Sequence, residues 1–183
     1  LFKLTSLSAA QEQEAKEMDL YIDFESLGID KDKFIKGMFS YESLWQGANA
    51  TPANPEYVLT HEYMEDPYAY DDSRYTYFLP LSMSIHHGYS SFEPMQDLVD
   101  AYWSIDGKTI PDKIPVETRK ANYEKIWNFA KGLSAEEYKA FATSPDLMTY
   151  DYMKEFKNRD SRLYVTLLFP FKGWHETAAG ELY

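Results

Sequence analysis

Aromatic and acidic residues gather between positions 61 and 78, in the stretch "HEYMEDPYAYDDSRYTYF". Six aromatic rings stand there among five carboxylates, with too little aliphatic side chain to fill an ordinary core. A tyrosine needs a partner for its hydroxyl and is often left half exposed, so this many rings favour a recognition surface. For any single ring, packing into a loop-rich core remains the alternative.

The segment from Met64 to Pro94 has no sustained periodicity and is rich in Tyr, Asp, Ser, Pro and His. Long irregular loops in compact domains are usually functional or disordered, and disordered segments are poor in aromatic residues. We therefore expect an ordered loop here, and this loop is the candidate binding site.

Metal chemistry finds little support in the sequence. His61-Glu62 lacks the second histidine of a metalloprotease helix. The neighbours His86-His87 would point to opposite sides of an extended chain. The acids at 30 and 32 lack the glycine and the final glutamate of a calcium loop. We expect no metal and no cofactor.

Catalysis by paired carboxylates is the main alternative to simple binding. A glycosidase needs two acids facing each other across the scissile bond, one of them with a pKa raised by burial. The acids near the rings lie in a stretch that we expect to be solvated: Asp66, Asp71, Asp72 and Glu93. No G-x-S-x-G elbow, phosphate loop or Rossmann glycine pattern is present. We expect a protein that is not an enzyme, with a glycoside hydrolase or lyase as the alternative.

Composition and charge narrow the choice of partner. The 183 residues, 44% of them hydrophobic, suit one domain with its own core. A net charge of −12 disfavours nucleic acids and anionic membranes but leaves neutral sugars unaffected. No apolar run approaches the roughly 20 residues of a membrane-spanning helix. Without an initiator Met, signal peptide or any cysteine, the chain is interpreted as a fragment of a larger protein.

Helix-forming residues dominate the first part of the chain. Ser8 is a good N-cap, with Gln11 three residues later to complete a capping box. Gly28 ends this helix, and Asp30 can cap a second one with an apolar stripe. We predict an antiparallel helix pair, joined by a short turn, over residues 8–47.

The second part, residues 48–94, has few helix-forming residues. "GANATPANP" cannot continue a helix, because it combines small residues with two prolines. The alternating "YVLTHEY" predicts a strand, after which the irregular binding-loop candidate follows.

The third part, residues 95–183, is expected to combine helices, turn motifs and a strand. Spacing predicts a helix from Val116 to Lys131, and Ser134 with Glu137 predicts a capping box. The apolar, partly β-branched "LYVTLLFP" predicts a strand.

Two segments of this third part point to structure more than to chemistry. In "LVDAYWSIDGKTIP", Asp106-Gly107 predicts a tight turn after a helix. In "FKNRDSRLYVTLLFP", Arg159 and Arg162 flank Asp160, a spacing suited to charge-assisted hydrogen bonds that hold the incoming strand.

In this order, the two segments resemble the SusD/RagB family of outer-membrane nutrient-binding lipoproteins. "NPEYVLTHEY", after a helix ending in "SYESLW", also resembles that family. The resemblance covers about residues 40–170, and several ordered motifs carry it. Ser161 stands where the family usually carries proline, and the lipobox cysteine, the early helical repeats and the final helices are absent.

The resemblance implies a mainly α fold, with a tetratricopeptide-like helical scaffold, a long irregular aromatic loop region and a few short strands. The chain would form one partial domain, 1–183. The resemblance also implies a non-catalytic protein of the outer membrane and cell surface, lipid-anchored in its intact form. Such a protein binds oligosaccharides and delivers them to a SusC-like TonB-dependent transporter.

Sugar binding explains the aromatic loop. A pyranose has an apolar C–H face on which Tyr and Trp stack, and hydroxyls that polar side chains bind. We predict these ligand-binding residues: Trp45, Tyr68, Tyr70, Tyr75, Tyr77, His87 and Tyr89. The motif positions are assigned to fold maintenance: Asp100, Tyr102, Asp106, Gly107, Arg159, Asp160 and Arg162. A helical-repeat scaffold that binds protein is the remaining alternative.

Overall fold

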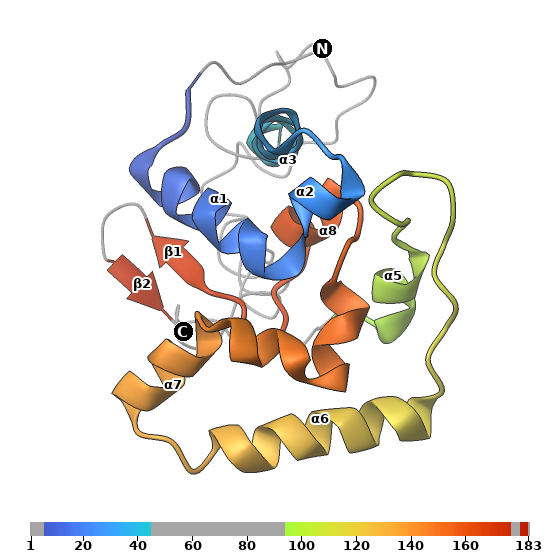
Figure 1. The fold of residues 1–183 in the computed structure, drawn as a ribbon, viewed down its shortest axis with the longest axis vertical. Helices are drawn as coiled ribbons and strands as arrows, with labels where there is room; N and C mark the ends of the chain where they lie inside the picture. Colours follow the sequence, from blue (N-terminus) through green and yellow to red (C-terminus); the bar gives the residue numbers. More distant parts are fainter. Residues whose placement is uncertain (1–5, 45–93, 177–179, 183) are drawn as a thin grey trace, which may run out of the picture.

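The computed structural model describes residues 6–44, 94–176 and 180–182 (Figure 1). Helices make up most of this part of the chain, and the strands in it are confined to one short hairpin. The mainly α prediction is therefore confirmed. None of the described helices is long and apolar enough to cross a membrane.

The first helix, α1 (Ala9–Tyr21), begins at the predicted capping box. The Gln11 N–H donates to Ser8 Oγ at 3.2 Å, and the Ser8 N–H donates to Gln11 Oε1 at 3.1 Å. The prediction that Gly28 ends this helix was wrong, because the chain becomes extended at Ile22 and Asp23 caps a separate short helix, α2 (Phe24–Leu27). Gly28 ends α2, and its φ of 63° lies in the left-handed region that favours glycine.

Asp30 caps α3 (Lys31–Ser43) through the Lys33 N–H, as predicted. The prediction that the first two long helices, α1 and α3, pack antiparallel is wrong. In Figure 1, α3 is seen end-on while α1 lies across the view, so the two axes cross. The intervening α2 gives the chain a second turn, and α3 packs most extensively on α8 instead of α1.

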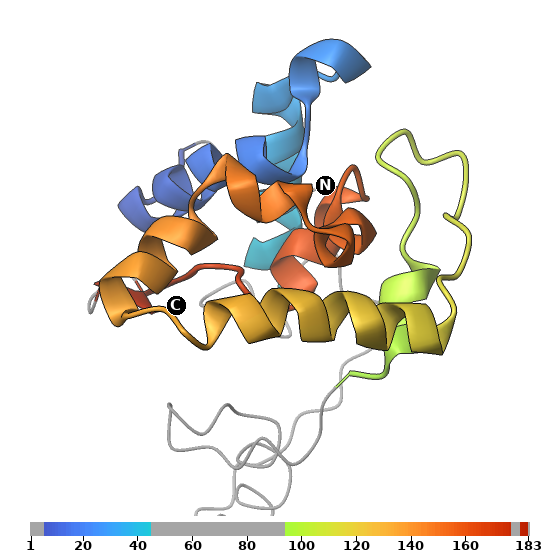
Figure 2. The same cartoon turned by 60° about the horizontal axis from the view of Figure 1, so that its bottom comes forward.

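Three helices follow in the second half. α5 (Gln96–Ala101) leads through a turn and an extended connection to α6 (Val116–Ala130), and α7 (Ala135–Ala142) comes next. The predicted capping box at Ser134 and Glu137 is present. Figure 2 shows α6 as a long rod along one side of the described residues, with α5 near its start.

The chain returns through two 3₁₀ helices, η3 (Pro145–Thr149) and η4 (Asp151–Phe156), to α8 (Ser161–Thr166). A strand had been predicted at "LYVTLLFP", and its first residues form α8 instead. Asp160 caps this helix by accepting from the Arg162 N–H at 2.9 Å, and helical geometry buries Leu163 and Tyr164 against α3. Beyond it, β1 (Trp174–Glu176) pairs antiparallel with β2 (Gly180–Leu182).

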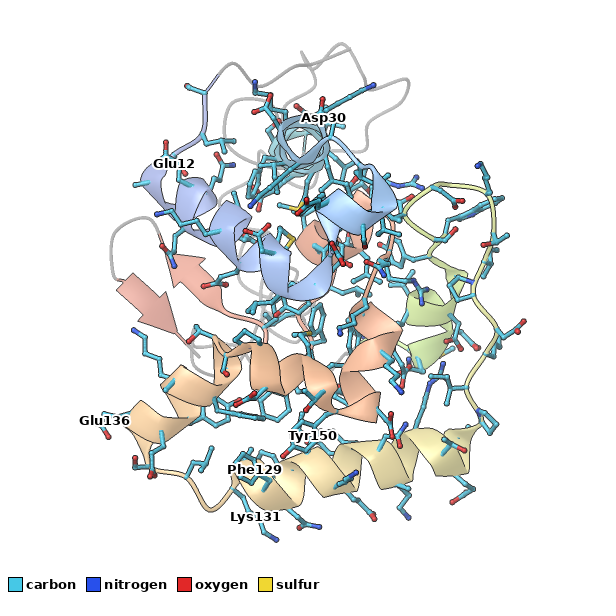
Figure 3. The ribbon with its side chains drawn as sticks, in the orientation of Figure 1. Glu12, Asp30, Phe129, Lys131, Glu136 and Tyr150 are labelled. Carbon is cyan, nitrogen blue, oxygen red and sulfur yellow. The ribbon has the colours of Figure 1, made fainter. Side chains whose placement is uncertain are left out.

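The core lies between α1, α3, α8 and the 3₁₀ helices and is built largely of rings. Phe156 and Phe169 stack with ring centroids 4.0 Å apart, and Tyr21 meets Phe169 edge-on at 5.6 Å. On the α6 side, Figure 3 shows Phe129 beside Tyr150, with centroids 6.1 Å apart. Glu12 and Glu136, which are exposed, lie toward the outside in the same view. Much of the aromatic content therefore serves packing.

Candidate functional site

The two motif segments named in the sequence analysis lie against each other. Ser104 and Arg159 form an antiparallel bridge. Beside it, the Ile105 N–H donates to Asn158 O and the Asp160 N–H donates to Trp103 O, both at 2.9 Å. Residues that are more than 50 positions apart in sequence are thus joined by main-chain hydrogen bonds.

The predicted tight turn at Asp106-Gly107 is present. Gly107 has a φ of 65° and donates its N–H to Ser104 O at 2.9 Å. Asp106 Oδ1 accepts from Ser104 Oγ at 2.6 Å and from the Lys108 N–H at 3.1 Å. The turn fixes the segment that carries residues 102 and 103.

Arg159 is only 6% exposed and binds main-chain oxygens. Its Nη2 donates to Val99 O and to Tyr102 O, each at 2.7 Å, and its Nη1 donates to Glu155 O at 3.1 Å. These contacts join the end of α5 to η4. Within the described part of the chain, Arg159 donates to these main-chain oxygens, whereas the neighbouring Asp160 pairs with Arg162.

A buried ion cluster lies beside Arg159. Arg119 on α6 donates to both oxygens of Asp100 and, through Nε at 2.7 Å, to Glu155 Oε2. Asp100 and Glu155 are 7% and 5% exposed. Burial raises the pKa of Glu155, although Arg119 opposes this effect. Among the described residues, Glu155 Oε1 has no hydrogen-bond partner.

Asp160 and Arg162 form a second, separate ion pair. Arg162 Nε donates to both Asp160 oxygens, at 3.0 and 3.1 Å, and its Nη2 donates to Oδ2. Burial works to raise the pKa of Asp160, but the bonds from Arg162 outweigh it and hold that pKa below its ordinary value. The Arg162 side chain is 51% exposed, so this pair reaches the surface.

Arg162 lines a pocket of about 290 Å³. The other described lining residues come from α3, from α5 and from the two positions after α5: Tyr41, Leu98, Ala101, Tyr102 and Trp103. Trp103 is 41% exposed, and Leu98 is 42% exposed. We call these six residues the Trp103 pocket. Rings, aliphatic surface and one guanidinium form a small site with both stacking and hydrogen-bonding groups.

Two helices that line the Trp103 pocket flank the predicted binding loop in sequence. α3 ends at Ser43 and α5 begins at Gln96, and the loop candidate lies between these two helices in sequence. Both helices contribute to the lining of the pocket.

A larger cavity, of about 470 Å³, lies between the α1–α2 connection and residues 157–158. Two of its lining carboxylates are already engaged, since Asp19 pairs with Lys31 and Asp23 accepts from the Ser26 N–H. Its two aromatic residues, at 21 and 24, are buried in the core. In the described part of the chain, no group of three His, Cys, Asp or Glu could hold a metal ion. The Trp103 pocket is therefore the better candidate site.

All of the predicted ligand-binding residues lie outside the described residues: Trp45, Tyr68, Tyr70, Tyr75, Tyr77, His87 and Tyr89. Their role stays a prediction. Trp103 and Tyr41 are not among the residues predicted to bind ligand, and Tyr102 and Arg162 were predicted to serve the fold alone. In "DAYW", the signal available was a tryptophan directly after a helix and before a tight turn, where a large ring is only partly covered.

Comparison with known proteins assigns the chain to a family. The sequence model of the SusD family matches residues 55–182. The chain belongs to the SusD family. No curated protein and no solved structure matches it. The matched range includes both motif segments and the part of the Trp103 pocket that lies on α5 and α8.

Membership in the SusD family supports glycan binding in nutrient uptake. Proteins of this family are generally non-catalytic, associate with the outer membrane as lipoproteins and work with SusC-like transporters. A pocket with an exposed tryptophan, flanking tyrosines and an arginine has the side-chain types that sugar binding uses.

Proposed function

We propose that this protein is a non-catalytic glycan-binding protein of the cell surface that delivers oligosaccharides to a TonB-dependent outer-membrane transporter. The Trp103 pocket is the observation that carries the proposal for this chain. Its rings offer apolar faces for a pyranose, and Arg162 offers N–H donors for hydroxyl groups. The aromatic residues predicted in the 45–93 segment would extend the site, because this segment connects two of its helices.

The positions of the described carboxylates are consistent with a protein that binds a glycan without cleaving it. The Trp103 pocket has no carboxylate among its described lining residues. Glu155, whose pKa is raised, is buried against Arg119 and lines neither described cavity. A glycosidase pair would need two such groups facing a substrate. The alternative enzyme would have to use the carboxylates at 66, 71, 72 and 93, and product formation from labelled oligosaccharides would reveal it.

The test is binding of a polysaccharide panel by affinity electrophoresis and calorimetry, with Trp103→Ala as the main variant. Tens of Å² of ring face lost at about 25 cal/mol per Å² correspond to roughly 1 kcal/mol, so affinity should fall about fivefold. Trp127→Ala is the matched control, because Trp127 is 46% exposed but lies on α6, outside the pocket. Equal effects of the two substitutions would refute the pocket assignment.

Two further variants address the loop. Tyr75→Ala and Tyr77→Ala should each weaken the same ligand if the 45–93 segment completes the site. Binding that responds to Trp103→Ala alone would confine the site to the described pocket. Binding of protein partners in place of any glycan would favour the scaffold alternative.

A further inference from the structure

The positive charge that Arg162 brings to the Trp103 pocket is neutralised by Asp160. Arg162 is the one charged residue among its described lining residues, and Asp160 stands next to it without lining the pocket. The Asp160 side chain is 17% exposed and accepts three hydrogen bonds from the guanidinium. A ligand therefore meets the outer N–H groups of an arginine whose positive charge is already paired.

This arrangement has consequences for the kind of sugar that binds. A hydroxyl group can accept from the N–H groups of Arg162 that point away from Asp160, and this needs no net charge on the sugar. An anionic sugar would compete with Asp160 for the same guanidinium and would approach a protein of net charge −12. The rings can stack on both kinds of sugar, so the Asp160–Arg162 ion pair must distinguish between them.

We infer that the Trp103 pocket selects uncharged glycans over uronate-containing ones, and that Asp160 sets this selectivity by neutralising Arg162. The inference rests on the proposed glycan binding and adds the class of ligand. It gives Asp160 a specificity-determining role in addition to its role in the fold.

Asp160→Asn isolates the charge. Asparagine is as good an N-cap as aspartate, so the bond from the Arg162 N–H and the start of α8 should persist. The substitution leaves Arg162 with an uncompensated positive charge, which charge-assisted bonds to a carboxylate would use. Circular dichroism should show unchanged helix content.

The experiment compares neutral polysaccharides, such as glucans, xylans and mannans, with polygalacturonate and alginate. Wild-type protein should bind one or more neutral polymers, in a manner sensitive to Trp103→Ala, and should bind the uronates at least tenfold more weakly. In Asp160→Asn, uronate affinity should rise at least tenfold and fall again with added salt. Affinity for the neutral glycan should drop about threefold, because the guanidinium loses the partner that orients it.

Asp151→Asn is the matched control, since it removes one carboxylate from an exposed ion pair with Lys154 on η4. It makes the same change in net charge and should alter neither affinity. An equal gain in uronate binding by both variants would overturn the inference, as would wild-type protein that binds uronates through Trp103 as tightly as neutral glycans. Loss of the proposed function looks different, because then Trp103→Ala changes the binding of no polymer at all.

Discussion

Two arginines three positions apart, Arg159 and Arg162, occupy opposite environments. Arg159 is 6% exposed and donates to three main-chain carbonyl oxygens, next to the buried cluster around Arg119. Arg162 is 51% exposed, is held by one carboxylate and faces the Trp103 pocket. The turn of chain at Asp160 and α8 directs one guanidinium inward and the other outward. A single short motif therefore serves the fold and the surface at once.

The surroundings of a guanidinium decide how much free energy of unfolding is lost when it is removed. Buried donors and acceptors lose their hydrogen bonds without gaining water, whereas exposed groups are rehydrated. Large effects on stability are therefore expected from Arg159 and small ones from Arg162, with the reverse order for ligand binding.

Arg159→Met should have the largest effect on stability. Three carbonyl groups lose the guanidinium that donates to them, one in a buried bond and two in part-buried bonds, and Asp100 and Glu155 lose a nearby positive charge. We expect the free energy of unfolding to fall by about 3–5 kcal/mol, measured by urea denaturation. Arg159→Lys keeps a charge but cannot donate to three acceptors in a plane, so it should recover less than half of this loss. A change within about 1 kcal/mol for Arg159→Met would break the comparison.

The contributions of Glu155 and Asp160 to stability should change in opposite directions with pH. Burial raises the pKa of Glu155 above its ordinary 4.5, so the folded state holds that proton more tightly than the unfolded chain. This contribution to stability is complete below pH 4.5 and is lost as the pH rises through the higher folded-state pKa. Asp160 has a lowered pKa, so its contribution is present above its ordinary 3.8 and is lost as the pH falls below that value.

Unfolding free energies of wild type, Glu155→Gln and Asp160→Asn, measured from pH 3 to 8, test these signs. The advantage of wild type over Glu155→Gln should shrink as the pH rises above 4.5. The advantage over Asp160→Asn should shrink as the pH falls toward and below 3.8. Parallel pH profiles for the two differences would contradict the assigned environments.

Local features of the fold could be predicted from sequence because they depend on few residues. The capping boxes at Ser8 and Ser134, the Asp30 cap of α3 and the Asp106-Gly107 turn are all present. Each is decided by side chains within a few positions, and family motifs placed the chain in its family.

Features that depend on distant contacts could not be predicted in this way. α8 was expected to be a strand, since its apolar, partly β-branched residues suit either structure. The Asp160 cap and the packing on α3 stabilise this segment as a helix. Trp103 likewise becomes part of a pocket only because its carbonyl pairs with Asp160 and α3 brings Tyr41 nearby. No spacing in the sequence joins these residues.

Arg162→Ala should have the smallest effect on stability and a clear effect on binding. The pair with Asp160 is half exposed on the arginine side, and such pairs contribute about 0–1 kcal/mol. Urea denaturation should therefore place the variant within about 1 kcal/mol of wild type. Loss of the pocket's guanidinium should weaken a neutral glycan roughly threefold to tenfold, equivalent to one hydrogen bond. Arg162→Lys keeps the charge without the planar fork and should restore stability more fully than binding. Should Arg162→Ala instead destabilise the protein as strongly as Arg159→Met, both arginines would belong to the fold, and the outward one would have no separate part in ligand selection.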